Sequence, residues 1–149
     1  MAAPFFILIE GRVLTDKKKI STARAFAIEA AKVALSRHCT DVSVLDLTGK
    51  SPATNYFVIC TGTSGRQMRT VSDEISQTGR EMGHKRFGRA GYDQGRWILL
   101  DFVDVVVHIF DEEYRDYYDL ELLWGDAERL SFDRDIKAPE EVETTQEDE

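Results

Sequence analysis

The chain has 149 residues, of which 27 are acidic and 19 basic, and its formal charge is −8 with the histidines neutral. This length is typical of one domain with a substantial core, which needs neither a second domain nor a disulfide framework. Residues 133–149 contain eight acidic and two basic side chains, so the rest of the chain carries only −2. We expect this acidic tail to be disordered, and the total charge does not exclude a ribonucleoprotein partner for the body.

The N-terminal residues and the cysteines exclude further classes of protein. The apolar run Phe5 to Ile9 is too short to span a membrane, and no basic residue precedes it as in a signal peptide. We therefore expect a cytoplasmic protein without a membrane partner, and residues 1–20 are interpreted as an N-terminal extension. Cys39 and Cys60 have no metal-binding spacing, and we predict that both are buried free thiols.

The first predicted elements are one helix and two strands. Residues 21–37 are rich in alanine and place apolar side chains on one face, which favours a helix. Residues 41–47 and 56–62 are β-favouring runs separated by a loop with a glycine and a proline. This arrangement is typical of two strands joined by a turn-like connection.

A second helix is predicted directly after the second strand. Met68, Val71 and Ile75 recur at helical intervals, while Ser64 is a suitable N-cap. Gly83 is a suitable end for this helix, because glycine readily leaves the helical conformation. The segment therefore reads as a strand, a tight turn and a helix.

The last third of the body contains a hairpin and a final helix. A weak strand is predicted over residues 86–90, followed by strong strands over 97–102 and 105–110 that form an antiparallel hairpin. The order of elements predicts an α/β fold, a single domain with a mixed β-sheet of about five strands and helices on its faces.

The stretch from Trp97 to Trp124 carries more apolar side chains than one small sheet needs. Its two strands are nearly continuous in apolar residues, which suits strands covered on both faces. In the helix that follows, six of the eight residues 117–124 are apolar or aromatic, and we expect Tyr117, Leu120 and Trp124 to pack inward from one face. The surplus apolar surface predicts a protein partner.

The sequence contains neither a phosphate-binding motif nor the paired carboxylates of a nucleotidyltransferase. Thr61 to Arg66 form a turn before a helix, where free amides can bind phosphate, but the segment has no Walker lysine or three-glycine fingerprint. We favour a plain N-capped turn. A nucleotidyltransferase would need paired carboxylates for magnesium, yet the next segment offers only Asp93, and Asp101 and Asp104 flank the predicted hairpin turn.

His108 alternates with apolar neighbours in a predicted interior strand. No Ser, Cys or second His has a spacing that indicates a catalytic partner, so we favour a core or contact histidine over a catalytic base. We therefore predict no catalytic, cofactor-binding or metal-binding residues, and a protein that is not an enzyme.

Basic side chains gather around the weak strand. They either form a solvated edge, which we favour, or contact an RNA backbone together with Tyr92 and Trp97. These residues are Arg80, Lys85, Arg86, Arg89 and Arg96.

Two long segments point to a known family. DVSVLDLTGKSPATNYFVICTGTS and, after a helix, WILLDFVDVVVHIFDEEYRDYYDLELLWGDA closely resemble the ribosomal silencing factor (Iojap) family. The resemblance covers about residues 24–127, and we place the family domain at residues 21–132. It implies a nucleotidyltransferase-like mixed sheet without an active site.

The resemblance also implies a function. Members of this family bind the large ribosomal subunit at ribosomal protein fourteen, sterically block joining of the small subunit, repress translation when nutrients are limiting, and form homodimers when free. The alternatives are a large-subunit assembly factor and a nucleotidyltransferase-like or phosphate-handling enzyme. No DNA partner is expected.

Five residues of the apolar stretch are expected to contact the partner or a second copy, although each can instead belong to the core. They are Trp97, Asp101, His108, Tyr118 and Trp124. The chain departs from the family at the hairpin turn, where residues 102–104 read FVD and many relatives have a tighter Gly-Asp turn.

Overall fold

The computed structural model describes residues 22–132 and shows a six-stranded sheet with helices on both faces. This confirms the predicted α/β domain, with one strand more than expected. The predicted N-terminal extension and acidic tail lie outside the described residues. After a helix over residues 22–36, the elements are β1 (Thr40–Asp46), β2 (Tyr56–Thr61), α2 (Gly65–Glu81), β3 (Gly88–Ala90), β4 (Trp97–Asp101), β5 (Val105–Phe110), α3 (Glu112–Tyr118), α4 (Leu120–Leu123) and β6 (Glu128–Arg129).

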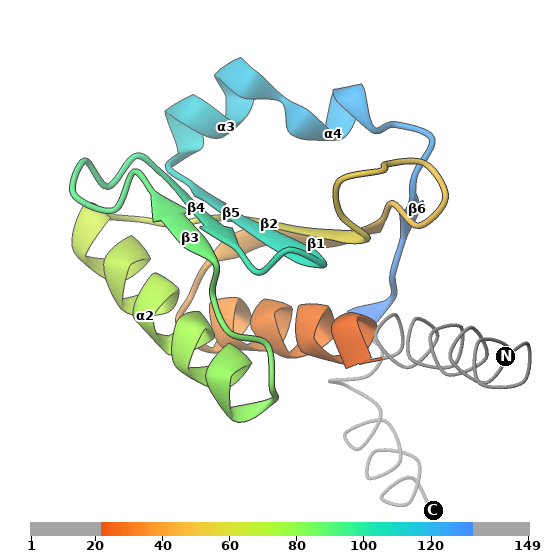
Figure 1. Ribbon diagram of the computed structural model, residues 1–149. Coiled ribbons are helices and arrows are strands. Elements are labelled where there is room, and N and C mark those ends of the chain that lie inside the picture. The colour runs from red at the N-terminus through yellow and green to blue at the C-terminus, as the bar shows by residue number, and fades with distance from the viewer. Residues whose placement is uncertain (1–21, 133–149) are drawn as a thin grey trace, which may run out of the picture.

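The helices form two layers around the sheet. The helix of residues 22–36 and α2 lie on one face, which we call the first face, and α3 and α4 lie on the second face (Figure 1). The main core lies on the first face, where Ile98, Leu100 and Val107 of the hairpin are fully buried. Cys39 and Cys60 are buried there as free thiols, as predicted.

The strand order β3-β4-β5-β2-β1-β6 follows from one parallel pairing in the middle of the sheet. β4 and β5 form the predicted antiparallel hairpin, with Leu99 opposite His108. β2 and β5 run parallel, with Phe57 opposite Val106, and the other ladders among the described strands are antiparallel. Because side chains alternate between faces, Phe57, Leu99, Val106 and His108 all lie on the second face.

The predicted N-cap of α2 is confirmed. The backbone N–H of Gln67 donates to Ser64 Oγ at 3.1 Å, and Thr63 donates its N–H to Gln67 Oε1 at 2.7 Å. Reciprocal bonds of this kind satisfy amides that a helix start otherwise leaves free. These contacts favour the plain N-capped turn over an anion site at Thr61–Arg66.

The predicted final helix is broken into two pieces. Asp119 adopts φ 42°, a left-handed conformation that ends α3 before α4 begins. The expectation that Tyr117 packs inward is wrong, since the break leaves this side chain 80% exposed, whereas Leu120 and Trp124 pack against the smaller core of the second face. An aspartate tolerates this conformation because its short polar side chain can bond locally.

The hairpin turn contains a strained residue. Val103 has φ 73°, a conformation that β-branched side chains rarely adopt. We expect Val103→Gly to raise the free energy of unfolding by about 1 kcal/mol, because glycine adopts this φ without strain. Urea denaturation measures the change. In the same loop, Asp104→Gly should lower stability because Asp104 has no positive φ, and stabilisation by both changes would contradict the explanation.

Candidate partner-binding groove

The second face of the sheet is only partly covered. On β4, Ile98 and Leu100 are fully buried on the first face, whereas Trp97, Leu99 and Asp101 on the second face are half-buried. The expectation that both hairpin strands are covered on both faces is therefore wrong for β4. The reason is that α3 and α4 are short and contain no buried residue, so this layer leaves apolar surface open.

An open groove of about 440 Å³ lies on this half-covered face. It spans β2, β4 and β5 and is bordered by residues that precede β3 and follow α4. Its polar lining includes Asp101 and His108. Its apolar lining consists of Ala53, Phe57, Phe87, Leu99, Val103, Val106 and Trp124.

His108 lines this groove and holds a buried donor without a partner among the described residues. The residue is 4% exposed, and Trp97 Nε1–H donates to its Nδ1 at 3.2 Å. An indole nitrogen only donates, so a neutral His108 carries its proton on Nε2. Nε2 has no hydrogen-bond partner among the described residues. A buried donor without a partner costs about 1 to 3 kcal/mol, and the Nε2 atom itself is not exposed at the surface of the groove.

Burial keeps the His108 ring neutral, since it lowers the pKa to about 4. The unfolded chain, with the ordinary histidine value of 6.5, therefore binds this proton first as the pH falls. The stability given by the neutral ring is complete above about pH 6.5 and is lost progressively down to about pH 4.

We expect the free energy of unfolding to fall by about 2 kcal/mol between pH 7 and pH 4.5, because His108 takes up a proton more readily in the unfolded chain. Urea denaturation at pH steps across this window measures the loss in the natural chain and in a His108→Gln variant. The variant should show a flatter pH dependence, because glutamine does not titrate. Equal slopes would show that the ring does not carry the effect.

Ring contacts connect most of the predicted contact residues. Trp97 lies 4.7 Å from Tyr118 between ring centroids, and Phe57 lies 4.6 Å from His108 and 6.3 Å from Trp124. Trp97 also lies 6.0 Å from His108, so Trp97, His108, Tyr118 and Trp124 belong to one aromatic cluster that includes Phe57. Of these rings, Phe57, His108 and Trp124 line the groove, whereas Trp97 and Tyr118 do not.

The fifth predicted contact residue has a structural role as well. Asp101 lines the groove, and its Oδ1 accepts the N–H of Val103 at 2.8 Å, which fixes the hairpin turn. The sequence-based prediction missed the groove residues Phe57, Phe87, Leu99, Val103 and Val106. Only Phe87 offered a local signal, because it is an apolar residue within a basic stretch, and the structure leaves it 79% exposed.

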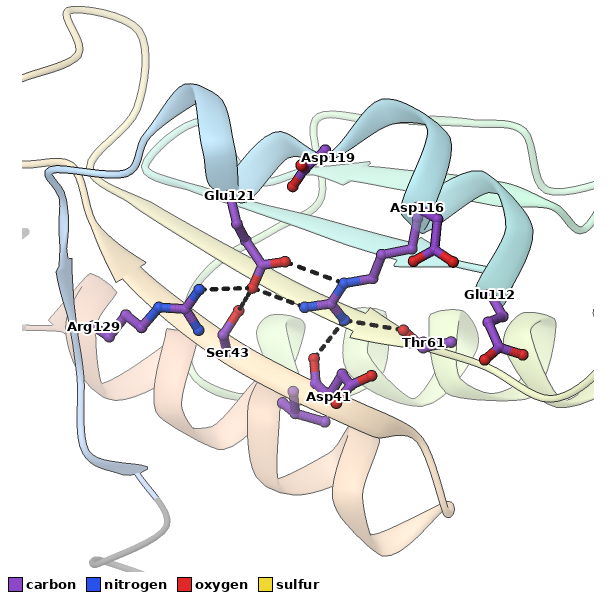
Figure 2. A pocket seen from close by; sticks show the side chains of 10 residues that line it. Asp41, Ser43, Thr61, Glu112, Asp116, Asp119, Glu121 and Arg129 are labelled. Carbon is purple, nitrogen blue, oxygen red and sulfur yellow. Dashed lines mark hydrogen bonds and ion pairs between the residues drawn. The ribbon is translucent and has the colours of Figure 1, made fainter.

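A second pocket, of about 490 Å³, lies between β1 and the α3–α4 segment and is lined mainly by charged residues. Figure 2 shows Glu121 reaching down to Ser43 and Arg129, which both donate to its carboxylate at 3.1 Å. Arg115 donates to the same carboxylate at 2.9 Å, to Thr61 Oγ1 at 3.0 Å, and to the Asp41 carbonyl.

Arg115 and Glu121 form the centre of a hydrogen-bonded network in this charged pocket. Burial alone would raise the pKa of Glu121, but the hydrogen bonds and charge of Arg115 hold it below its ordinary value. Within residues 22–132, no group of three or more His, Cys, Asp or Glu side chains is placed to hold a metal ion. We interpret the network as the anchor of the α3–α4 layer on β1 and β2.

The two aspartates that flank the hairpin turn make different contacts. Asp101 directs its carboxylate to the turn, where it accepts the N–H of Val103. Asp104 contributes its main-chain carbonyl, which accepts from the N–H groups of Asn55 and Tyr56. The carboxylate of Asp101 is therefore used within the turn.

Comparison with known proteins assigns the chain to a family. The sequence model described as "Ribosomal silencing factor during starvation" matches residues 20–149. The chain belongs to the ribosomal silencing factor family. It is similar to ribosomal silencing factor RsfS of Bacillus subtilis, with 39% identity over 70% of this chain and 88% of that protein. It is also similar to the chloroplastic protein Iojap of Zea mays, with 36% identity over 69% of this chain and 45% of that protein.

A solved structure supports the same assignment. A crystal structure from Chromobacterium violaceum superposes with a TM-score of 0.64 and 33% identity, covering 71% of this chain and 86% of that one. As a ribosomal silencing factor, the chain has a ribosome-associated role in regulating translation. None of the helices in the described part of the chain is long and apolar enough to cross a membrane.

Proposed function

We propose that this ribosomal silencing factor binds the large ribosomal subunit at ribosomal protein fourteen, blocks joining of the small subunit and represses translation when nutrients are limiting. The observation that carries the proposal is the half-covered groove, which apolar side chains line together with His108. Family membership supplies the ribosome as the partner.

The groove has the features of a protein contact. Aromatic and leucine side chains are common anchors at the centre of interfaces, and here Leu99 and Trp124 lie beside the buried donor of His108. A complementary segment would insert an apolar side chain into this groove. We therefore assign Trp97, Asp101, His108, Tyr118 and Trp124 to the contact, either directly through the groove or by holding its wall.

Repression of this kind requires no catalysis. A domain of this size can cover about 800 Å² on its partner, which is a standard protein interface. If that surface also forms bridges to the small subunit, one bound copy excludes joining sterically. The extent of repression then follows the concentration of the factor relative to its dissociation constant.

The free protein is proposed to be a cytoplasmic homodimer. Tyr117, Leu122 and Leu123 on the α3–α4 layer are each more than 70% exposed, and several large apolar side chains on one short segment are unusual for a monomer. A second copy of the chain would cover them.

Sedimentation tests the proposed function directly. Purified full-length protein is mixed with separated large and small subunits, and gradient fractions are probed for the protein. We expect it to migrate with free large subunits, to be absent from joined ribosomes and to reduce the joined fraction in proportion to its concentration. Migration with neither subunit, or unchanged joining at saturation, would refute the proposal.

A further inference from the structure

The end of α2 and the edge strand β3 carry a concentration of positive charge, which we call the basic edge. It consists of Arg80, Lys85, Arg86 and Arg89. Within residues 22–132, its one ion pair joins Arg89 to Asp73 at 3.0 Å. Arg86 and Arg80 instead donate to the neutral oxygens of Ser76 and Gln77. Most of the charge on this edge is therefore not neutralised within the described fold.

The guanidinium groups of the basic edge influence one another. Burial lowers the pKa of Arg86, and the nearby positive charges of Arg89 and Arg80 lower it further. Like charges held this close favour binding of an anion that can bridge them. Arg96 was predicted to lie with these basic residues around the weak strand. It does not belong to the basic edge, because its guanidinium pairs with Asp111 at 2.6 Å and with Glu113.

Aromatic side chains accompany these charges. Phe87 follows Arg86 directly, is 79% exposed and also lines the groove. The guanidinium of Arg89 lies 3.7 Å from the centre of the Tyr92 ring. Basic side chains that contact phosphates, next to an exposed ring on which a base can stack, are a combination that RNA-binding surfaces use.

The charge of the molecule is also polarised. Residues 111–129 contain eight acidic and two basic side chains, and α3 and α4 place most of this acidic segment on the second face (Figure 1). A polyanion is therefore repelled by the α3–α4 layer and attracted to the basic edge, which fixes one orientation of approach.

We propose that the basic edge binds the sugar-phosphate backbone of ribosomal RNA, with Phe87 at the junction between this RNA contact and the groove. The inference rests on the proposed function, since it places the RNA on the same large subunit as the groove's protein partner. The RNA contact adds salt-dependent affinity and orients the domain, while the groove supplies the apolar anchors.

A matched pair of triple variants tests the RNA contact in the full-length chain. Arg80→Gln/Lys85→Gln/Arg89→Gln removes three charges from the basic edge, and Arg24→Gln/Lys32→Gln/Lys50→Gln removes three from other surfaces. Kd for purified large subunits is measured over a series of KCl concentrations. We expect the edge variant to bind about 10-fold more weakly near 0.1 M salt and to flatten the log–log salt slope by about 2, and the control to change little. Equal effects in the two variants, or none in either, would overturn the RNA contact.

Crosslinking identifies the class of macromolecule at the junction. With p-benzoylphenylalanine in place of Phe87, irradiation on purified large subunits should give a product that nuclease digests. A product made only with ribosomal protein would overturn the RNA contact. Failure of the natural chain to bind large subunits would instead defeat the proposed function, whereas tight binding with an unaffected edge variant would defeat the RNA contact alone.

Discussion

A Leu99→Glu variant is expected to lose about 100-fold in affinity for the large ribosomal subunit, which corresponds to about 3 kcal/mol. Leu99 is half-buried in the groove beside His108, so water still reaches the new carboxylate in the free protein. A partner that covers the groove would remove this water, and an unpaired charge is costly to desolvate. Gradient sedimentation or a filter assay with labelled protein measures the loss.

Two further variants separate the groove from general effects. Ala25→Glu adds the same charge to an exposed position on the helix of residues 22–36, which lies outside the groove and outside the proposed dimer surface, so its binding should stay within about 2-fold of the natural chain. Val103→Asn removes an apolar groove residue while keeping the left-handed φ that asparagine tolerates, and it should bind more weakly. Unchanged binding in both groove variants would exclude the groove as the contact.

Arg115→Met is expected to lower the free energy of unfolding by about 3 kcal/mol. The Arg115 side chain is only 11% exposed and its partner Glu121 20%, so neither charge is well solvated. Without the guanidinium, the carboxylate of Glu121 keeps only Ser43 and Arg129 as partners, and Thr61 Oγ1 loses a donor. Urea denaturation at pH 7 measures the change.

An exposed ion pair provides the comparison for this network. Arg37 and Glu74 pair at 2.7 Å, but their side chains are far more exposed, so Arg37→Met should lower stability by less than about 1 kcal/mol. The double variant Arg115→Met/Glu121→Gln should recover part of the loss, because the uncompensated charge is gone. Equal losses for Arg115→Met and Arg37→Met would show that burial does not strengthen the network.

Much of the fold was predictable because local patterns and tertiary packing agree. The nearly continuous β-favouring runs of β2 and β5, the cap at Ser64 and the short hairpin connection each identify an element without knowledge of its neighbours. Two features were not predictable in this way. β6 is a two-residue strand that exists through its pairing with β1. The break at Asp119 interrupts a segment whose apolar residues fit one continuous helix.

The candidate site was predictable only in part, for a physical reason. The sequence showed that the hairpin and the last helices contain more apolar and aromatic side chains than one small sheet needs. In the structure, the aromatic side chains of this surplus lie on the second face. Which strand stays half-covered depends on how far the α3–α4 layer extends, and this is a property of the whole fold. The bonds of Arg115 to Asp41 and Thr61 span 74 and 54 residues, so no local pattern indicates them.

The absence of buried residues in α3 and α4 has a consequence for motion. Elements with few buried apolar contacts open locally, at a free energy below that of global unfolding. Amide hydrogens of residues 112–124 should therefore exchange with solvent through opening of this layer while the strands stay closed. Trp124 forms part of the groove wall, so each opening would also dismantle the docking surface. Binding at the groove would then slow exchange in a segment whose amides the partner need not touch.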